Sequence, residues 1–307
     1  MTWNTLYKTR FTPPPGYQYL QEGRRELLIR KGSEDRLRRQ GLLNPAKLWN
    51  KAPQPSHLAG RGEVLLITGK QGEVAVRKYR HGGLLRCLTG DRFFFGSRPF
   101  QEIAVTEKVR SAGVPTLEIL AAIMERGWGG WYRGYLITRY LTAATDLISY
   151  LNDEPKNERR KAVIEKAGEA VKKIHQAGIY HADLHLKNFL VEGKKVYLID
   201  FDKSTITNRL HPSQRIKNLK RLDRSAEKLK RLGLPLSGQD KGVFCRAYIS
   251  GDTEIPPYLH TYLKRYRWYQ QLYRAGWWIA RIFYPHSNPR KKSTIDSAIR
   301  SSIPPQK

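Results

Sequence analysis

The sequence predicts an α+β protein with two lobes, a small β-rich lobe followed by a larger helical one. Three observations lead to this prediction: a length of 307 residues, an apolar fraction of 40%, and the order of strand-like and helix-like segments. A chain of this length can bury roughly three quarters of its unfolded surface, enough for one large domain or two small lobes. The strand-like segments gather ahead of the long helices instead of alternating with them, which favours an α+β fold over a parallel βαβ sheet.

The first lobe is expected to span residues 56–140. Two β-rich runs, Glu63 to Thr68 and Glu73 to Tyr79, are separated by a Gly-Lys-Gln-Gly turn that is typical of a hairpin. A helix is expected from about Arg98 to Ala112, because a proline stands near its start and a glycine just past its end. The run from Tyr135 to Tyr140 predicts another strand.

The second lobe is expected to span residues 141–250. From about Glu158 to Ala177 the apolar residues recur at helical spacing, which predicts a long amphipathic helix ending at Gly178. Two short apolar runs then flank a Glu-Gly-Lys turn, one from Asn188 to Val191 and one from Lys195 to Phe201. These runs predict a second hairpin.

Two basic extensions are expected outside the lobes. Residues 1–55 are rich in proline and arginine and are predicted to be loosely structured. Residues 251–307 are predicted to form a basic, aromatic, helical extension. Between Tyr258 and Tyr284 there are ten aromatic residues, five Lys or Arg and no acid. Such a helix either packs on the larger lobe or lies at a membrane interface.

The composition indicates a polyanionic partner. Lys and Arg number 56 against 27 Asp and Glu, a net charge of +29, which suits nucleic acid, an anionic lipid surface, or a phosphorylated or carboxylated substrate. Cys87 and Cys245 predict neither a disulfide framework nor a structural zinc site, and they favour a reducing compartment. No apolar run is long enough to span a bilayer, so the protein is expected on the cytosolic side, soluble or peripheral.

The chemistry is expected between the long helix and the end of the second hairpin. Asp183 follows the helix, Asn188 comes five residues later, and Asp200 ends a predicted strand. Mg²⁺ prefers carboxylate and amide oxygens, so Asn188 and Asp200 are candidate metal ligands for phosphoryl transfer. Asp183 is the candidate catalytic residue, which orients an acceptor hydroxyl and takes its proton.

The pattern of His181, Asp183, Asn188 and Asp200 resembles the HxDxxxxN motif of protein kinases with its following metal-binding Asp. This resemblance implies a bilobal, protein-kinase-like fold that uses ATP and Mg²⁺.

The same resemblance assigns nucleotide-binding residues upstream. It makes Gly60 and Gly62 the phosphate-covering turn, although a full GxGxxG is absent. In the kinase strand VAxK the lysine holds the α and β phosphates, and here Arg77 stands at that position. Lys78 is the alternative cation if the register shifts by one residue, and Arg77 is preferred.

The partner of that cation is expected on the helix at 98–112. Glu102 is preferred over Glu107, because it lies nearer the start of the helix. The metal-binding motif reads Asp-Phe-Asp instead of Asp-Phe-Gly, and no Ala-Pro-Glu follows it. The activation segment of regulated protein kinases is therefore shortened or missing, and a protein substrate is not expected.

A smaller branch of kinases resembles this chain more closely. Five stretches are similar to bacterial lipopolysaccharide kinases, in particular 3-deoxy-D-manno-octulosonic acid (Kdo) kinases: Gly60–Gly62, Val76–Leu84, Ala112–Pro115, His181–Leu184 and Ile199–Lys203. In that family an arginine occurs at the position of the preferred cation. The resemblance implies ATP-dependent phosphorylation of a Kdo hydroxyl on a lipid A precursor. A heptose kinase of the same pathway is the alternative.

The resemblance also implies partners and a location. The expected partners are a Kdo-containing lipid A precursor and the anionic surface of the bacterial inner membrane, with the protein peripheral on its cytoplasmic side. Nucleic acid is not the expected partner. A nucleic-acid-binding protein, or a catalytically inactive kinase fold that acts as a binding module, is the alternative from another class. The former leaves the carboxylates unexplained.

The segment from Asn208 to Pro235 is the most basic part of the second lobe, with nine Lys or Arg against two acids and apolar residues at helical spacing. It is interpreted either as the solvated face of a packed helix or as a surface that recognises phosphate or carboxylate groups of the acceptor. In the second case the contacts would come from Arg215, Lys217, Lys220, Arg221 and Arg224.

Overall fold

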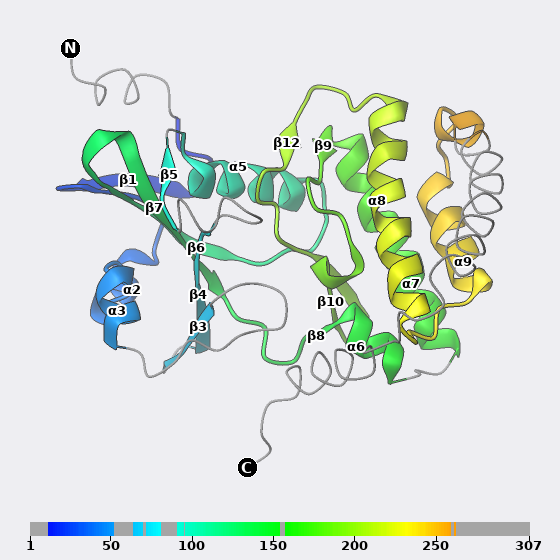
Figure 1. Cartoon of the computed structure of the whole chain (residues 1–307), viewed down its shortest axis with the longest axis horizontal. Coiled ribbons are helices and arrows are strands. Elements are labelled where there is room, and N and C mark those ends of the chain that lie inside the picture. The colour runs from blue at the N-terminus through cyan, green and yellow to red at the C-terminus, as the bar shows by residue number, and fades with distance from the viewer. Residues whose placement is uncertain are drawn as a thin grey trace, which may run out of the picture. The chain divides into compact units, whose positions relative to one another are not determined.

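A computed structural model of the chain describes residues 12–51, 64–69, 72–80, 91–94, 96–153, 157–258 and 261. These residues form two compact units, whose elements are drawn in Figure 1. Unit 1 comprises the described residues up to Ser111, those from Thr116 to Ala143, and residues 201–203. Unit 2 comprises residues 112–115 and the described residues among 144–200 and from 204 to 261.

Unit 1 is built on a seven-stranded antiparallel sheet with the strand order β1-β2-β6-β7-β4-β3, and β5 pairs with β7. The strands are β1 (Tyr17–Glu22), β2 (Arg25–Arg30), β3 (Val64–Gly69), β4 (Gly72–Lys78), β5 (Phe93–Phe94), β6 (Ile119–Arg126) and β7 (Trp131–Arg139). The helical elements are α2 (Glu34–Arg39), α3 (Pro45–Lys51), α5 (Arg98–Ser111) and the short η1 (Trp128–Gly130).

The sheet of unit 1 buries side chains on both faces, because successive strand residues point to opposite sides. One core is shared with α2 and α3 and includes Leu27, Ile29, Leu37, Leu42, Val74, Val76, Ile123 and Ile137. The other core is shared with α5 and includes Leu28, Phe100, Ile103, Ala122, Met124 and Leu136. The sheet is therefore a middle layer with helices on both sides.

This layer corrects the expectation that residues 1–55 are loosely structured. β2 pairs with β6 inside the sheet, with Leu27 opposite Ile123 and Ile29 opposite Ala121. The hairpin β1–β2 and the helices α2 and α3 thus belong to the sheet and its core. Composition concealed this strand, because its apolar run is only three residues long and stands among charged residues.

Unit 2 is mainly helical. α7 (Asn157–Gln176) packs against α9 (Gly238–Ile249) so closely that a Cβ added at Gly168 would lie 2.6 Å from the Phe244 carbonyl oxygen. Two small sheets have the strand orders β11-β10-β8 and β12-β9. The other elements are β8 (Thr145–Asp146), α6 (Leu147–Asn152), β9 (Ile179–Tyr180), η2 (Leu186–Asn188), β10 (Phe189–Glu192), β11 (Lys195–Leu198), β12 (Thr205–Ile206) and α8 (Pro212–Arg231).

Most expected elements of both lobes are confirmed. The expected helices are α5 and α7, the two hairpins are β3–β4 and β10–β11, and the strand at 135–140 is the second half of β7. Strand β6 is absent from those expectations. Its residues Ile119 to Met124 are all buried, so the strand shows no alternation of apolar and polar residues. The expected aromatic extension lies outside the described residues from position 262 on.

Candidate functional site

The loop that carries Asp183 begins where α7 ends. The chain turns at Gly178, whose φ of +76° is accessible to glycine at little cost. A Cβ at this position would also lie 1.9 Å from the Thr207 carbonyl oxygen. β9 then pairs with β12, and Asp183 follows three residues after Tyr180. The start of the loop is therefore fixed by a turn that only glycine fits.

Asn188 closes this loop. Its Nδ2 donates a hydrogen bond to the Asp183 carbonyl oxygen (2.8 Å), and its own carbonyl oxygen accepts one from the Ile199 amide (3.0 Å). The Asn188 residue is buried, with 2% of its surface exposed. Asn188 thus contacts Asp183 directly. It also contacts Ile199, the neighbour of Asp200 in the sequence.

His181 links the same two segments, and its partners define its tautomer. Nδ1 accepts from the Asp183 amide (3.2 Å), and Nε2 lies 3.1 Å from the Ile199 carbonyl oxygen. A carbonyl oxygen can only accept, so Nε2 carries the hydrogen and the ring is neutral. Burial lowers the pKa of His181 to about 4, which keeps the ring neutral at physiological pH.

Asp200 has an unusual backbone conformation. Its φ is +65°, and among the described non-glycine residues only Lys203 shares a positive φ. The left-handed region costs an L-residue roughly 1–2 kcal/mol, and Asp enters it more readily than most. Residues held in such conformations concentrate at functional sites. The two lie on either side of the Phe-Asp pair that completes the expected Asp-Phe-Asp motif.

The Asp183 carboxylate is held between two donors. His185 Nε2 lies 3.0 Å from Oδ2, and Arg221 NH1 of α8 lies 3.3 Å from Oδ1 and also donates to the Ala182 carbonyl oxygen. The hydrogen bond from His185 lowers the pKa of Asp183 to about 2, and the Arg221 charge adds to this effect. The Asp183 side chain is 55% exposed, so an ionised carboxylate faces solvent.

A buried chain of hydrogen bonds supports this loop from behind. Arg215 Nε donates to the Tyr248 hydroxyl (2.9 Å), which donates to His175 Nδ1 (2.8 Å). His175 Nε2 donates to Asn218 Oδ1 (3.0 Å), and Asn218 Nδ2 donates to the His181 carbonyl oxygen (2.7 Å). Burial lowers the pKa of His175 to about 3, so this chain is neutral at its centre.

These hydrogen bonds show that the expected role of Arg215 in recognising the acceptor is wrong. Arg215 is buried and forms an ion pair with Asp252, so its charge does not face solvent. His185 and the supporting residues were not predicted as site residues. His185 stands two residues after Asp183, which is the only sequence signal that could have found it. The supporting residues come from α7, α8 and α9, and no local pattern connects them.

Unit 1 contains the expected cation pair. Arg77 of β4 donates to both carboxylate oxygens of Glu102 of α5 (2.7 and 2.6 Å), and the Tyr79 hydroxyl donates to the same carboxylate. Burial, followed by the Glu102 charge, raises the pKa of Tyr79 well above its usual value. Lys78 is the next strand residue and pairs instead with Asp91. Of the two candidate cations, Arg77 is the one that meets Glu102.

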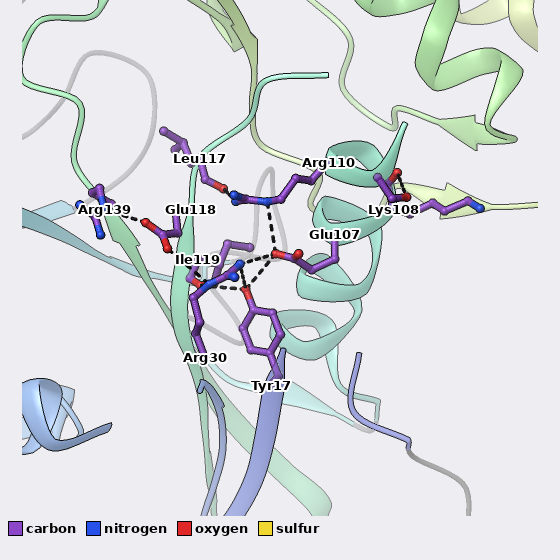
Figure 2. Close-up of polar contacts among 10 residues, drawn as sticks. Tyr17, Arg30, Glu107, Lys108, Arg110, Leu117, Glu118, Ile119 and Arg139 are labelled. Atoms are coloured by element: carbon purple, nitrogen blue, oxygen red, sulfur yellow. Dashed lines mark hydrogen bonds and ion pairs between the residues drawn. The ribbon is translucent and has the colours of Figure 1, made fainter. Parts of the chain in front are cut away.

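Glu107, the other candidate partner, belongs to a separate network (Figure 2). Its carboxylate pairs with Arg30 of β2 (2.5 Å) and accepts from the Tyr17 hydroxyl of β1 (3.1 Å). Arg30 also donates to the Ile119 carbonyl oxygen of β6 (3.1 Å). The network joins α5 to the two N-terminal strands. Glu107 therefore holds the helix on the sheet, while Glu102 faces Arg77.

The expected Asp-Phe-Asp motif makes a further contact within unit 1. Asp202 forms a two-bond ion pair with Arg98 at the start of α5, with one of the bonds, from Nε to Oδ1, at 3.0 Å. Forked pairs of this kind between guanidinium and carboxylate are among the stronger hydrogen-bonded contacts in proteins. An acid in place of the usual glycine is thus explained by a partner on α5.

Two of the predicted site residues, Gly60 and Gly62 of the expected phosphate-covering turn, lie outside the described residues. Within the described ranges there is no cluster of three or more His, Cys, Asp or Glu suited to hold a metal. A Mg²⁺ site made from Asn188 and Asp200 would accordingly need other ligands. Mg²⁺ commonly obtains these from substrate phosphates and water.

Comparison with known proteins agrees with this geometry. The sequence profile of the lipopolysaccharide kinase (Kdo/WaaP) family matches residues 48–248. The chain belongs to this family. Membership of a kinase family makes the protein a phosphotransferase with a hydroxyl acceptor, and it implies the use of ATP.

Relatives of the Kdo/WaaP family are similar over most of their own length. A 3-deoxy-D-manno-octulosonic acid kinase of Vibrio cholerae serotype O1 is 34% identical over 174 residues, which cover 55% of this chain and 72% of the relative. A protein of the same name from Xylella fastidiosa is 30% identical over 196 residues, which cover 62% of this chain and 76% of the relative.

A solved structure supports the fold class. The chain aligns with WaaP, solved in complex with acyl carrier protein, at a TM-score of 0.53 and 20% identity, covering 78% of this chain and 96% of WaaP. The expected α+β, bilobal, protein-kinase-like fold is thereby confirmed. Within the described part of the chain, no helix is long and apolar enough to cross a membrane.

Proposed function

We propose that this protein transfers the γ-phosphoryl group of ATP to a hydroxyl of a Kdo sugar on a lipid A precursor, as a step in building the lipopolysaccharide core. The observation that carries this proposal is the hydrogen-bonded loop of unit 2, in which Asn188 and His181 tie Asp183 to the residue before Asp200. The names of the curated relatives supply the sugar.

Asp183 is proposed to hold the acceptor hydroxyl. With a pKa of about 2 its carboxylate is ionised, so it accepts a hydrogen bond from the hydroxyl before any proton moves. It takes that proton while the hydroxyl oxygen bonds to the γ-phosphorus and the bond from phosphorus to the bridging oxygen of ADP breaks. A carboxylate of such low pKa is a weak base, so orientation is its larger contribution.

Asn188 and Asp200 are proposed to hold Mg²⁺. Their amide and carboxylate oxygens are the hard donors that this ion prefers, so the donor set fits. Asn188 commits its Nδ2 to the Asp183 carbonyl, which leaves the amide oxygen as the ligand atom of that side chain. When bound, the ion neutralises charge on the phosphate oxygens during transfer.

Arg77 is proposed to bind the α and β phosphates, with Glu102 fixing its position. Glu102 is 4% exposed, and its carboxylate orients the guanidinium by two hydrogen bonds. Arginine keeps its charge at any physiological pH and can bind two phosphate oxygens at once. The assignment of Gly60 and Gly62 to the same nucleotide stays a prediction.

The acceptor is proposed to be bound at the inner-membrane surface, with the protein peripheral on its cytoplasmic side. The net charge of +29 supports this location, because each Lys or Arg near an anionic bilayer gains about 1 kcal/mol.

The test is a transfer assay with radiolabelled ATP and three separate acceptors: Kdo-lipid A precursor, heptosylated core and casein. Label is expected only on the first. Asp183→Asn is expected to lower kcat by roughly 10²–10⁴-fold, because it removes the charge and keeps the shape. Asp153→Asn, an exposed change after α6, is the matched control. Label on heptosylated core alone, or full activity of Asp183→Asn, would contradict the proposal.

A further inference from the structure

α8 carries a row of exposed basic side chains. Lys217, Lys220, Arg221 and Arg224 are all exposed, and their spacing of three, four and seven residues places them on one face of the helix. We name these four residues the α8 stripe. The row is roughly 10 Å long, from the helical rise of about 1.5 Å per residue.

The buried side of α8 fixes the direction in which this stripe faces. Asn218 is fully buried and bonds to both the main-chain amide and the carbonyl of His181, and Ile216 and Leu222 lie in the core. The helix cannot rotate about its axis without breaking these contacts. The stripe is therefore held at a constant position relative to the loop of His181 and Asp183.

The α8 stripe makes a direct contact with the candidate catalytic residue. Arg221 NH1 lies 3.3 Å from Asp183 Oδ1 and donates to the Ala182 carbonyl oxygen. The guanidinium has five N–H donors, so it can hold Asp183 and a second anion at the same time. An anionic group of the acceptor bound at Arg221 would lie next to the hydroxyl that Asp183 orients.

The acids of α8 are engaged elsewhere. Asp223 and Glu227 both accept from Lys241 of α9, each at 2.6 Å. Within the described residues, neither Lys217 nor Arg224 forms an ion pair, and like charges at this spacing on a helix repel each other. Lys217 and Arg224 therefore add positive charge to this face without an acidic partner among the described residues, and a bound anion would relieve the repulsion.

We propose that the α8 stripe binds an anionic group of the acceptor, a phosphate or a carboxylate on the glycolipid, and so selects acceptors that carry one beside the reacting hydroxyl. This inference rests on the proposed function and adds the recognition of the acceptor to it. Arg221 positions the group next to Asp183, while Lys217 and Arg224 extend the binding surface along the helix.

The test uses the full-length protein and the variant Lys217→Ala/Arg224→Ala, which spares Asp183 and Arg221. In detergent-dispersed Kdo-lipid A precursor, the KM for the acceptor is expected to rise at least tenfold, with the KM for ATP unchanged. Lys230→Ala is the matched control. It removes an exposed cation nine residues beyond Arg221, which is about two and a half turns and hence the opposite face.

Two further measurements separate the possible failures. The first is the affinity for the glycolipid in the absence of ATP, measured by calorimetry. It is expected to fall in the same variant and not in Lys230→Ala. If the wild type binds the glycolipid through the stripe but transfers no phosphate, the proposed function is wrong and the binding site stands. If the effect appears only on phosphatidylglycerol vesicles and not in neutral detergent, the stripe contacts bilayer headgroups, and the inference is overturned. Unchanged binding in detergent overturns it as well.

Discussion

The two units hold their candidate site residues by different kinds of bonds. In unit 1, ion pairs do this work: Arg77 with Glu102, and Arg98 with Asp202. In unit 2, two neutral side chains, His181 and Asn188, hold the backbone of the Asp183 loop from its buried side, and Arg221 is the charged contact on its exposed side. Ion pairs keep their charges over a wide pH range, whereas a neutral imidazole gains a proton and a positive charge when the pH falls. Removal of one charged partner should therefore destabilise unit 1, and acidification should destabilise unit 2.

The contrast is tested most severely by removing the guanidinium of unit 1. Arg77→Ala leaves the buried Glu102 carboxylate without its cation, and loss of one partner from a buried pair costs about 3–5 kcal/mol. The free energy of unfolding, from urea denaturation, measures the loss. Replacing both charges, in Arg77→Met/Glu102→Leu, is expected to regain much of it. If the double variant is as unstable as the single one, the loss of stability comes from losing the ion pair itself and not from burying an unpaired acid.

Acidification tests unit 2. His175 and His181 have pKa values of about 3 and 4 in the fold, below the ordinary value of about 6.5. The unfolded chain therefore binds protons first as the pH falls, so the stability from both residues is present above about pH 6.5 and is lost toward pH 4. The loss should reach several kcal/mol and appear already at about pH 5, before most carboxylates titrate.

The matching measurement is urea denaturation at several pH values, with amide hydrogen exchange to locate the change. Amides of α7, α8 and β9 should lose protection at higher pH than those of the unit 1 sheet. His175→Gln keeps a donor and an acceptor but does not titrate, and it should flatten the pH dependence. Equal loss of protection in both units would contradict the comparison.

The smallest expected effect separates buried from exposed ion pairs within unit 1 (Figure 2). Arg30→Met removes a side chain that is 20% exposed and contacts Glu107, Tyr17 and the Ile119 carbonyl, and it should cost about 1–3 kcal/mol. Arg139→Met removes a side chain that is 51% exposed and contacts Glu118, and it should cost under about 1 kcal/mol. Thermal unfolding of both variants gives the comparison, and equal losses would contradict it.

Periodic and punctuated segments of the fold could be predicted from the sequence. α5 and α7 have clear ends, and the turns of both hairpins contain glycine. β6 could not be found by alternation, because it is buried on both faces. β2 could not be found by composition, because arginines flank its short apolar core. Both strands depend on neighbours that only the folded sheet provides.

The candidate site divides in the same way. The types and spacing of Asp183, Asn188 and Asp200 predicted their grouping, because the hairpin between the last two is short. The buried support was not predictable, since Tyr248 bonds to a histidine 73 residues away. Arg215 could have been set apart from the α8 stripe. It precedes Lys217 by two residues, about 200° around the helix, and so faces the core.

The left-handed backbone at Asp200 has a consequence for laboratory evolution of this protein. Glycine would adopt φ of +65° without steric cost and would relieve a strain of roughly 1 kcal/mol, but it would remove the carboxylate that we propose as a ligand of Mg²⁺. A laboratory selection that rewards heat resistance alone should therefore drift toward glycine at this position. A selection that also demands phosphoryl transfer should retain the aspartate and gain stability at Lys203 instead, which has a similar positive φ and no role in the proposed metal site.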